Sequence, residues 1–223
     1  MTHSVARVPE IATPARRKSS RRCFQMTADW AFYSRMLKLF EGRPGYRLAY
    51  DRGRLEIMSP SFRHDRADRF LGSLIPILAR AYGLPMVPGG TVTLRRKRKQ
   101  KGIEGDEVFW LANAPKVFAA TTLKLSIHPP PDLAIEVDVS RSSLNRLSLY
   151  AAMGVPEVWR LENEALMFYG LSQGPKLQPI AASMSFPAVT PGDLEGFLSK
   201  ARCSDHIAVL NEFEEWILAK LGQ

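Results

Sequence analysis

The chain has 223 residues, of which 45% are apolar and 24% are charged. These values are ordinary for a soluble globular protein, so they exclude wholesale disorder and suit one domain with short extensions. The formal net charge is +9, but residues 1–22 carry +5 and residues 95–101 carry +6, and subtracting both leaves −2 for the rest. Basic clusters of this kind attract polyanions, most often nucleic acid, although each cluster alone is equally consistent with a solvated tail or loop.

The cysteines and the N-terminus indicate the cellular compartment of the protein. Cys23 and Cys203 lie far apart and match no metal-ligand spacing, which excludes a disulfide scaffold and favours a reducing cytoplasm. No apolar run approaches the ~20 residues that span a bilayer, and the N-terminus lacks the apolar centre of a secretory signal. We therefore expect a cytoplasmic protein without a membrane span, with residues 1–25 as a disordered basic tail and residues 26–223 as a single domain.

Regular elements are predicted from Thr27 onward. Apolar residues recur at helical spacing from Trp30 to Phe40, and Asp51-Arg52-Gly53 forms a turn between two alternating runs, which predicts a hairpin. Strands are interleaved with helices along the rest of the chain, which predicts the α/β class. The predicted elements are, in order, a helix over 30–40 capped by Thr27 or Asp29, hairpin strands over 46–50 and 54–58, a helix over 64–82, strands over 91–94, 108–111 and 133–139, a helix over 143–153, hairpin strands over 157–161 and 166–169, and helices over 191–200 and 204–221.

The last predicted helix carries an apolar stripe with two interpretations. The stripe either packs on its own domain, which we favour, or forms the contact surface of a homodimer. Its members are Leu210, Phe213, Trp216, Ile217 and Leu221.

Two acidic residues lie where acids are unexpected. Glu136 interrupts the run Leu133–Val139, which is typical of a strand covered on both faces, and a buried carboxylate is costly unless it is paired or metal-bound. Asp106 opens the other apolar run, with Glu104 two residues earlier on the same predicted strand face. If the two strands are neighbours, their carboxylates converge, and such hard oxygen ligands suit Mg²⁺ or Mn²⁺.

Four further residues are possible members of this site: Glu104, Asp132, Asp138 and His64. The three acids are equally consistent with surface positions at strand ends. His64 opens the long predicted helix, where it would contact substrate, ligate a metal, pack against the helix start or have a simple surface role. The structure must decide between these interpretations.

Three strings of sequence, GIEGDEVFW, PPPDLAIEVDVS and SLNRLSLYAAMGVPEVWR, together resemble the Uma-two family of predicted endonucleases, which belongs to the PD-(D/E)XK, or restriction-endonuclease-like, superfamily. The hairpin YRLAYDRGRLEIMSPS, His64 and the string SFPAVTPGDLEGFL agree with that family. The resemblance covers roughly Thr27 to Leu198. It implies a mixed β-sheet flanked by helices, with an N-terminal β-hairpin and a metal held by Asp106 and Glu136.

The resemblance also implies roles for residues beyond the two metal ligands. The superfamily usually places a catalytic lysine two residues after the glutamate, where this chain has Asp138, and in the Uma-two branch a basic residue of the following helix takes over. The match here is Arg146, where many members have lysine, and Gly105 stands where the family usually has proline. Arginine stays protonated, so Arg146 cannot act as a general base, but it can stabilise developing phosphate charge.

Three functions are therefore in competition. The first is a Mg²⁺- or Mn²⁺-dependent endonuclease that hydrolyses DNA, and the second is a nuclease-fold protein that binds nucleic acid without cutting it, which Gly105 and Arg146 favour. The third is an enzyme acting on another substrate, since fold does not fix function, and the two basic clusters oppose it mildly. For either of the first two, the DNA backbone contacts are expected from Arg95, Arg96, Lys97, Arg98, Lys99 and Lys101.

Overall fold

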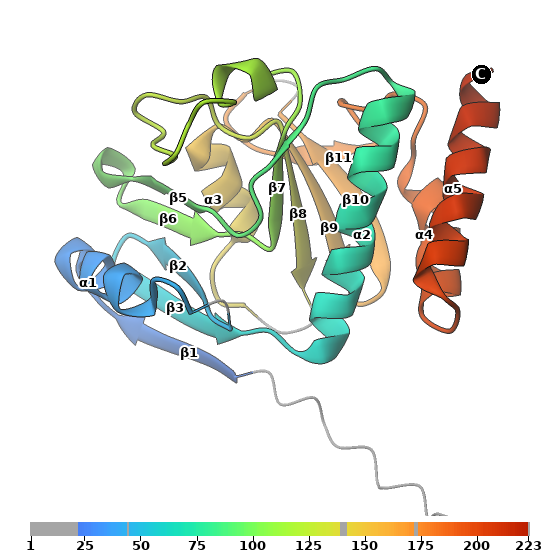
Figure 1. Cartoon of the computed structure of the whole chain (residues 1–223). Coiled ribbons are helices and arrows are strands. Elements are labelled where there is room, and N and C mark those ends of the chain that lie inside the picture. Colours follow the sequence, from blue (N-terminus) through green and yellow to red (C-terminus); the bar gives the residue numbers. More distant parts are fainter. Residues whose placement is uncertain (1–21, 44, 139–141, 172–173, 223) are drawn as a thin grey trace, which may run out of the picture.

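The computed structural model describes residues 22–43, 45–138, 142–171 and 174–222, which form two β-sheets and five α-helices (Figure 1). The predicted α/β class is confirmed, with two sheets in place of one. No helix among these residues is long and apolar enough to cross a membrane. Cys203 is an exposed free thiol.

The first sheet is antiparallel and contains the predicted N-terminal hairpin. Asp51 pairs with Arg54 across a two-residue turn, in which Arg52 and Gly53 both have positive φ, the conformation that suits tight hairpins. The strand order is β1-β3-β2-β6-β5. The strands are β1 (Arg22–Thr27), β2 (Arg47–Asp51), β3 (Arg54–Ser59), β5 (Thr93–Arg96) and β6 (Lys101–Glu104).

The predicted boundary of the tail is wrong. Residues 22–25, which we expected to be disordered, belong to β1, and this strand pairs with β3 from Arg22 opposite Ser59 to Thr27 opposite Arg54. The basic composition of this segment hid a strand whose partner lies about thirty residues further along the chain. The rest of the predicted tail, residues 1–21, lies outside the described residues.

The second sheet is mixed and has the order β11-β10-β9-β8-β7-β4. β8 and β9 are parallel, as expected for strands joined by a helical crossover, and the remaining pairs are antiparallel. The strands are β4 (Val87–Pro88), β7 (Glu107–Trp110), β8 (Leu133–Asp138), β9 (Glu157–Glu162), β10 (Ala165–Gly170) and β11 (Gln178–Ile180).

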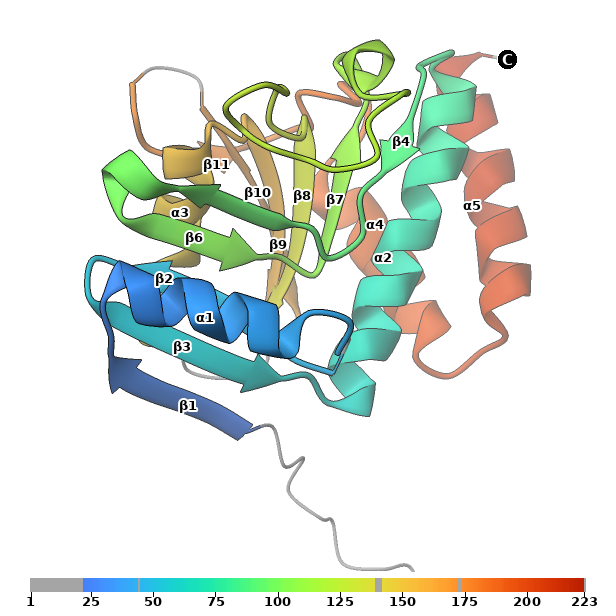
Figure 2. The ribbon, with the colours of Figure 1, turned by 60° about the vertical axis from the view of Figure 1, so that its left-hand side comes forward.

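The helices cover both sheets. α1 (Trp30–Phe40) lies over the first sheet, where Tyr33 stacks on Tyr50 (Figure 2). α2 (Phe62–Ala81) and α4 (Pro191–Ala201) pack on one face of the second sheet, α5 (His206–Leu221) packs on α2 and α4, and α3 (Arg146–Met153) packs between the two sheets. In the stripe of α5, Phe213 and Ile217 are buried and the other three members pack against the same core. The stripe therefore packs on its own domain, as we favoured.

Candidate active site

Asp106 and Glu136 lie side by side on neighbouring strands. β7 and β8 are antiparallel with Glu107 opposite Ile135, so the same register sets Asp106 beside Glu136. The backbone N–H of Val137 donates to Asp106 Oδ2 at 2.9 Å. Each side chain is only 1% exposed. The sequence predicted that the two carboxylates converge if their strands are neighbours. The two strands are neighbours in the fold, so the carboxylates do converge.

Gly105 allows a third group to approach these acids. A Cβ at this position would lie 2.2 Å from the hydroxyl oxygen of Tyr150, so any side chain there, including that of proline, would displace the tyrosine. The Tyr150 hydroxyl donates to Glu136 Oε2 at 2.8 Å, and burial together with the neighbouring Glu136 raises the pKa of Tyr150 well above its ordinary value. Glycine at position 105, in place of the proline usual in the family, therefore leaves room for the Tyr150 hydroxyl.

Arg146 neutralises part of the acidic cluster. It is the first residue of α3, which Asn145 caps, and its side chain is 3% exposed. Arg146 Nε lies 3.0 Å from Glu136 Oε1, and Nη2 lies 3.4 Å from Glu56 Oε1. Burial lowers the pKa of Arg146, but the charges of Glu136, Asp106 and Glu56 outweigh it and raise the pKa, so this side chain remains a cation.

Glu56 is a member of the cluster that the sequence did not indicate. It is 1% exposed and accepts hydrogen bonds from the Ser142 hydroxyl at 2.9 and 3.0 Å, from the Ser143 N–H and from Gln25 Nε2, in addition to its contact with Arg146. In the alternating pattern of its hairpin, an acid at this position is typical of a solvent-facing residue. No local signal distinguishes it, because its partners come from β1, α3 and the segment before α3.

His64 lies inside the cluster and not on the surface. Ser61 caps α2 by accepting a hydrogen bond from the His64 N–H at 3.4 Å, and this places the imidazole, 1% exposed, with Nε2 3.0 Å from Asp106 Oδ2. Burial raises the pKa of Asp106, but the hydrogen bond and charge of His64, the charge of Arg146 and the Val137 N–H together lower it. Asp106 is therefore held as a carboxylate.

Asp68 is a second member that the sequence reasoning missed. It lies four residues after His64 on α2, so both side chains project from the same helix face toward the acids. Burial, with the charges of Asp106 and Glu107, raises the pKa of Asp68 to about 9, which keeps its carboxyl protonated at neutral pH. The spacing of His64 and Asp68 was a usable signal, because both interrupt the apolar face of a long helix.

We expect Asp68→Asn to stabilise the fold increasingly as pH rises. Between the ordinary pKa of an aspartate and about 9, Asp68 is protonated in the folded chain and ionised in the unfolded chain. The free energy of unfolding therefore falls as pH rises across that window. Asparagine removes this loss, worth on the order of 1 kcal/mol per pH unit. Urea unfolding at pH 5, 7 and 9 measures it, with Glu215→Gln as an exposed control. Equal pH slopes in the wild type and Asp68→Asn would contradict the assignment.

Glu104 is not brought to Asp106, which corrects the expectation that the two share a strand face. The chain leaves the first sheet after Glu104 and enters the second sheet at Glu107, so the two acids lie on opposite sides of a break at Gly105. Glu104 Oε2 accepts from the Leu48 N–H at 2.8 Å, and its Oε1 accepts from the Thr93 hydroxyl at 2.7 Å. Its carboxylate therefore ties together strands of the first sheet.

Asp132 is also engaged elsewhere. It lies at the far end of β8 from Glu136, where Oδ2 accepts from the N–H groups of Leu111 and Asn113 at 2.7 and 2.9 Å. This is a structural turn contact and not a contribution to the acidic cluster. The side chain of Asp138 lies outside the described residues.

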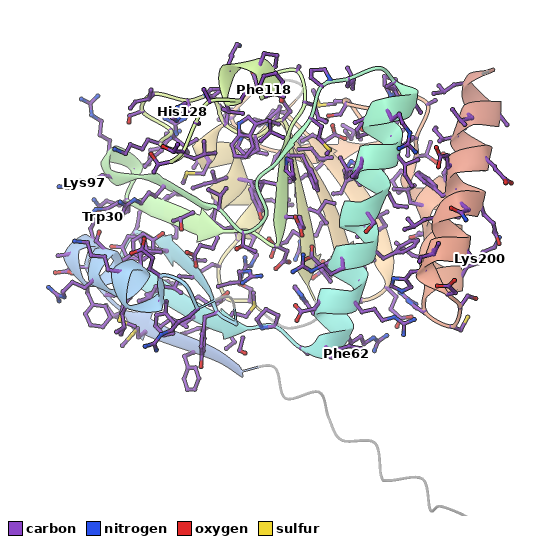
Figure 3. All side chains as sticks on the ribbon, in the orientation of Figure 1. Trp30, Phe62, Lys97, Phe118, His128 and Lys200 are labelled. Carbon is purple, nitrogen blue, oxygen red and sulfur yellow. The ribbon has the colours of Figure 1, made fainter. Side chains whose placement is uncertain are left out.

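The basic run 95–101 forms the tip of the β5–β6 hairpin, with a short 3-10 helix at Lys97–Lys99 (Figure 3). Half of its cations bind α3: Arg96 donates to the Met153 carbonyl at 2.9 Å, Lys99 to the Ala152 carbonyl at 2.8 Å and Lys101 to the Ser148 hydroxyl at 2.7 Å. The first two contacts satisfy carbonyls at the C-terminus of α3, a favourable place for cations. Among the described residues, Arg95, Lys97 and Arg98 make no such contact and remain exposed.

The cluster offers oxygen ligands for a small hard cation. Asp106 Oδ1 and Asp68 Oδ1 are buried, and neither has a hydrogen-bond partner within the described part of the chain. The same residues contain no group of three His, Cys, Asp or Glu side chains arranged to enclose an ion. Mg²⁺ commonly uses one or two carboxylates and keeps several waters, so Asp106 and Glu136 fit a site of that open kind.

Comparison with known proteins identifies the family. The model of the family Uma2, described as "Putative restriction endonuclease", matches residues 30–196. This chain belongs to the Uma2 family. A solved structure of a "putative nuclease belonging to DUF820" from Anabaena variabilis ATCC 29413 is similar with 12% identity and a TM-score of 0.45, covering 68% of this chain and 90% of that one. No curated protein matches.

The Uma2 match includes every described member of the acidic cluster except Gln25 of β1. Glu56, His64, Asp68, Asp106 and Glu136 all lie within the matched residues, as do Arg146 and Tyr150. Membership confirms the resemblance found in the sequence and supports a nuclease function in general terms. The metal, the substrate and the roles of single residues are matters of proposal.

Proposed function

We propose that this Uma2 protein is a metal-dependent endonuclease that hydrolyses DNA phosphodiester bonds. The observation that carries the proposal is the juxtaposition of Asp106 and Glu136 in a buried cluster where Asp106 Oδ1 has no hydrogen-bond partner among the described residues. A buried anionic oxygen without a partner is costly, and a bound cation removes that cost. The family description and the basic surface both favour a polyanionic substrate.

Asp106 and Glu136 are the residues that would hold Mg²⁺ or Mn²⁺. A divalent ion at such a site lowers the pKa of a bound water and offsets negative charge on the phosphate. His64 and the Val137 N–H orient Asp106, and the Tyr150 hydroxyl orients Glu136. These contacts hold both carboxylates in place before any ligand arrives, as a preorganised site requires.

Arg146 is suited to the phosphate and not to proton abstraction. Its guanidinium stays charged, and its buried Nη1 has no hydrogen-bond partner within the described residues, so one donor is available for a phosphate oxygen. We assign to Arg146 the stabilisation of developing phosphate charge.

The direct test is cleavage of supercoiled plasmid by purified full-length protein. We expect nicked and linear products with Mg²⁺ or Mn²⁺ and none after EDTA, with activity restored when the divalent ion is returned. Cleavage that persists in EDTA would contradict the metal dependence. Binding without cleavage under every divalent ion would overturn the proposed chemistry.

A second candidate function is nucleic-acid binding without cleavage. One observation favours it: both oxygens of Glu136 are already engaged, one by Arg146 Nε and the other by Tyr150, within a cluster that is almost fully buried. An arginine next to the glutamate supplies the positive charge that a metal would otherwise supply. Salt-dependent DNA binding without cleavage under any divalent ion distinguishes this candidate from an active nuclease.

The exposed cations of the β5–β6 hairpin should determine the salt dependence of DNA binding. Changing Arg95, Lys97 and Arg98 to Gln removes the three cations of the tip that bind nothing else in the described fold, so we expect weaker binding to all sequences. The slope of log K against log salt should fall by about 2–3, because each lost phosphate contact accounts for about 0.9. Fluorescence anisotropy at several salt concentrations measures the slope.

The matched control removes three cations from elsewhere on the surface: Arg80, Lys176 and Lys200. Figure 3 shows Lys200 on the opposite side of the molecule from Lys97. If both triple variants lower the slope equally, the hairpin is not a specific contact surface.

A further inference from the structure

A pocket with a volume of about 730 Å³ lies beside the acidic cluster, on another face of α2. Val137, Leu161, Phe70 and Leu198 give it an apolar lining. It is formed by the first turns of α2, the ends of β8 and β9, the β9–β10 turn, the end of α4 and the start of α5. Its size falls within the range of small-molecule sites.

Three arginines surround this apolar lining. Arg63, Arg66 and Arg202 all line the pocket, and Glu164 is the one acid among its lining residues, so these four side chains carry a net charge of +2. An apolar lining with a cationic edge is complementary to a ligand that combines a flat apolar part with a negative group. Neither feature belongs to the acidic cluster, whose charge has the opposite sign.

The arginines are held in place by contacts of their own. Glu164 bridges Arg63 and Arg202, with 3.0 Å between Arg202 Nη1 and Glu164 Oε2. Arg66 donates to the Ala201 carbonyl at 2.7 Å, and its Nε lies 3.2 Å from His206 Nε2. Preorganised cations lose less freedom when an anion binds, which favours affinity.

The β9–β10 turn supports a role for Glu164 beyond the hairpin. Asn163 and Glu164 have φ values of 49° and 74°, and a two-residue turn of this kind usually has glycine at its second position. A glutamate there is conformationally unfavourable, and its carboxylate contacts both Arg63 and Arg202. The turn thus places Glu164 between two of the arginines that line the pocket.

We infer that this pocket binds a nucleotide unit, with the base on the apolar lining beside Phe70 and the phosphate on the arginines. Asn163 offers an amide for the polar edge of a base. Phe62, 83% exposed at the start of α2, lies at the pocket and provides an aromatic surface for stacking (Figure 3). The occupant is either a free nucleotide or a nucleotide of a DNA strand.

The pocket adjoins the proposed cleavage site through two shared elements. On α2, Arg63, Arg66, Ala67 and Phe70 line the pocket, while His64 and Asp68 turn toward the acids. On β8, the Val137 side chain lines the pocket, while its N–H binds Asp106. A DNA strand bound at the acidic cluster would therefore have this pocket nearby for an unstacked base. The inference concerns binding alone and holds whether or not the cluster cuts DNA.

The test is calorimetric titration of the full chain with dAMP in EDTA. We expect saturable binding, with deoxyadenosine and inorganic phosphate each binding about tenfold more weakly or worse, because each lacks one half of the ligand. The double variant Arg63→Gln/Arg202→Gln should weaken dAMP binding by about tenfold or more. Both arginines are at least 42% exposed, so their loss leaves the fold intact. The control is Arg80→Gln on the same helix, outside the pocket lining, and its affinity should match the wild type.

A filling variant provides a second, charge-neutral test. Ala67→Phe places a ring among the lining residues and should abolish dAMP binding, with the fold checked by circular dichroism. Absence of saturable binding at about 5 mM dAMP, or affinity unchanged in both variants, would overturn the inference. Equal affinity for dAMP and phosphate, or for dAMP and an aliphatic carboxylate such as laurate, would overturn the assignment to a nucleotide.

Two further measurements separate the sources of the ligand and the two proposals. Displacement of dAMP by a single-stranded oligonucleotide supports a pocket for a DNA strand, whereas dAMP binding that the oligonucleotide leaves unchanged supports a site for free nucleotide. Asp106→Asn should retain dAMP affinity, because Asp106 does not line the pocket. A wild type that cuts DNA but does not bind dAMP would overturn the pocket alone, and a wild type that binds dAMP but does not cut DNA would overturn the nuclease proposal alone.

Discussion

Asp106→Asn and Glu136→Gln are each expected to reduce metal-dependent DNA cleavage by about a thousandfold or more, while DNA binding persists. Each change keeps the shape of the side chain and removes the charge that would hold the divalent ion, so the ion and its bound water are lost together. Removing a single preorganised electrostatic group from an active site commonly costs about 10²–10³ in rate, and loss of the metal adds to that. Plasmid cleavage under single-turnover conditions measures the loss.

The control for this experiment is an acid on the adjacent strand. Glu162→Gln on β9 removes a carboxylate that is 48% exposed and paired with Arg160, so cleavage should be unchanged. Unfolding curves for all three variants separate loss of chemistry from loss of structure, since Glu136→Gln also removes a partner of the buried Arg146. If purified, folded Asp106→Asn and Glu136→Gln cut DNA at the wild-type rate, the proposed site is wrong.

Arg146→Met should destabilise the fold by about 3–5 kcal/mol in metal-free buffer. The change leaves Glu136 and Glu56, each 1% exposed, without the cation that both contact, and uncompensated buried charge is among the costliest single defects. Methionine preserves most of the volume, so the loss reports on charge and not on a cavity. Urea unfolding in EDTA measures it, with Arg80→Gln as the exposed control.

The same variant tests whether the cluster accepts a metal. A divalent ion replaces the missing positive charge, so Mn²⁺ or Mg²⁺ should restore part of the stability of Arg146→Met and stabilise it more than the wild type. Equal responses of the two proteins to the ion would show that no cation site lies next to Arg146. Stability unchanged in EDTA would contradict the buried ion pairs themselves.

Several features of this site were readable in the sequence because they are local. Glu136 is identifiable because it is an acid inside an apolar strand, where a buried carboxylate is costly unless it is paired or metal-bound. The hairpin over 46–58 follows from a turn and two alternating runs. Asp106 was indicated by its place at the head of the other apolar run, and the family resemblance added Arg146; the fold places both in the same buried cluster.

Other features depended on segments far apart in the chain. Glu56 is buried because Gln25, Ser142 and Arg146 approach it from segments 31 to 90 residues away. The prediction of a disordered tail was wrong at β1 for the same reason, because β1 is an edge strand that forms by pairing with β3, about thirty residues away in the chain. Glu104 appeared to accompany Asp106, but the break at Gly105 sends it to another sheet.

The sequence by itself determined the class of fold and most elements, and it predicted Asp106 and Glu136 as the metal ligands. Only the tertiary structure decided that His64 and Asp68 face those acids, that Arg146 and Tyr150 contact Glu136, and that three of the six cations of the basic run bind α3. The physical reason is the separation along the chain over which each effect acts. Periodicity and turn chemistry act over a few residues, whereas the free energy of a buried charge depends on partners that strand register and helix packing deliver from distant segments.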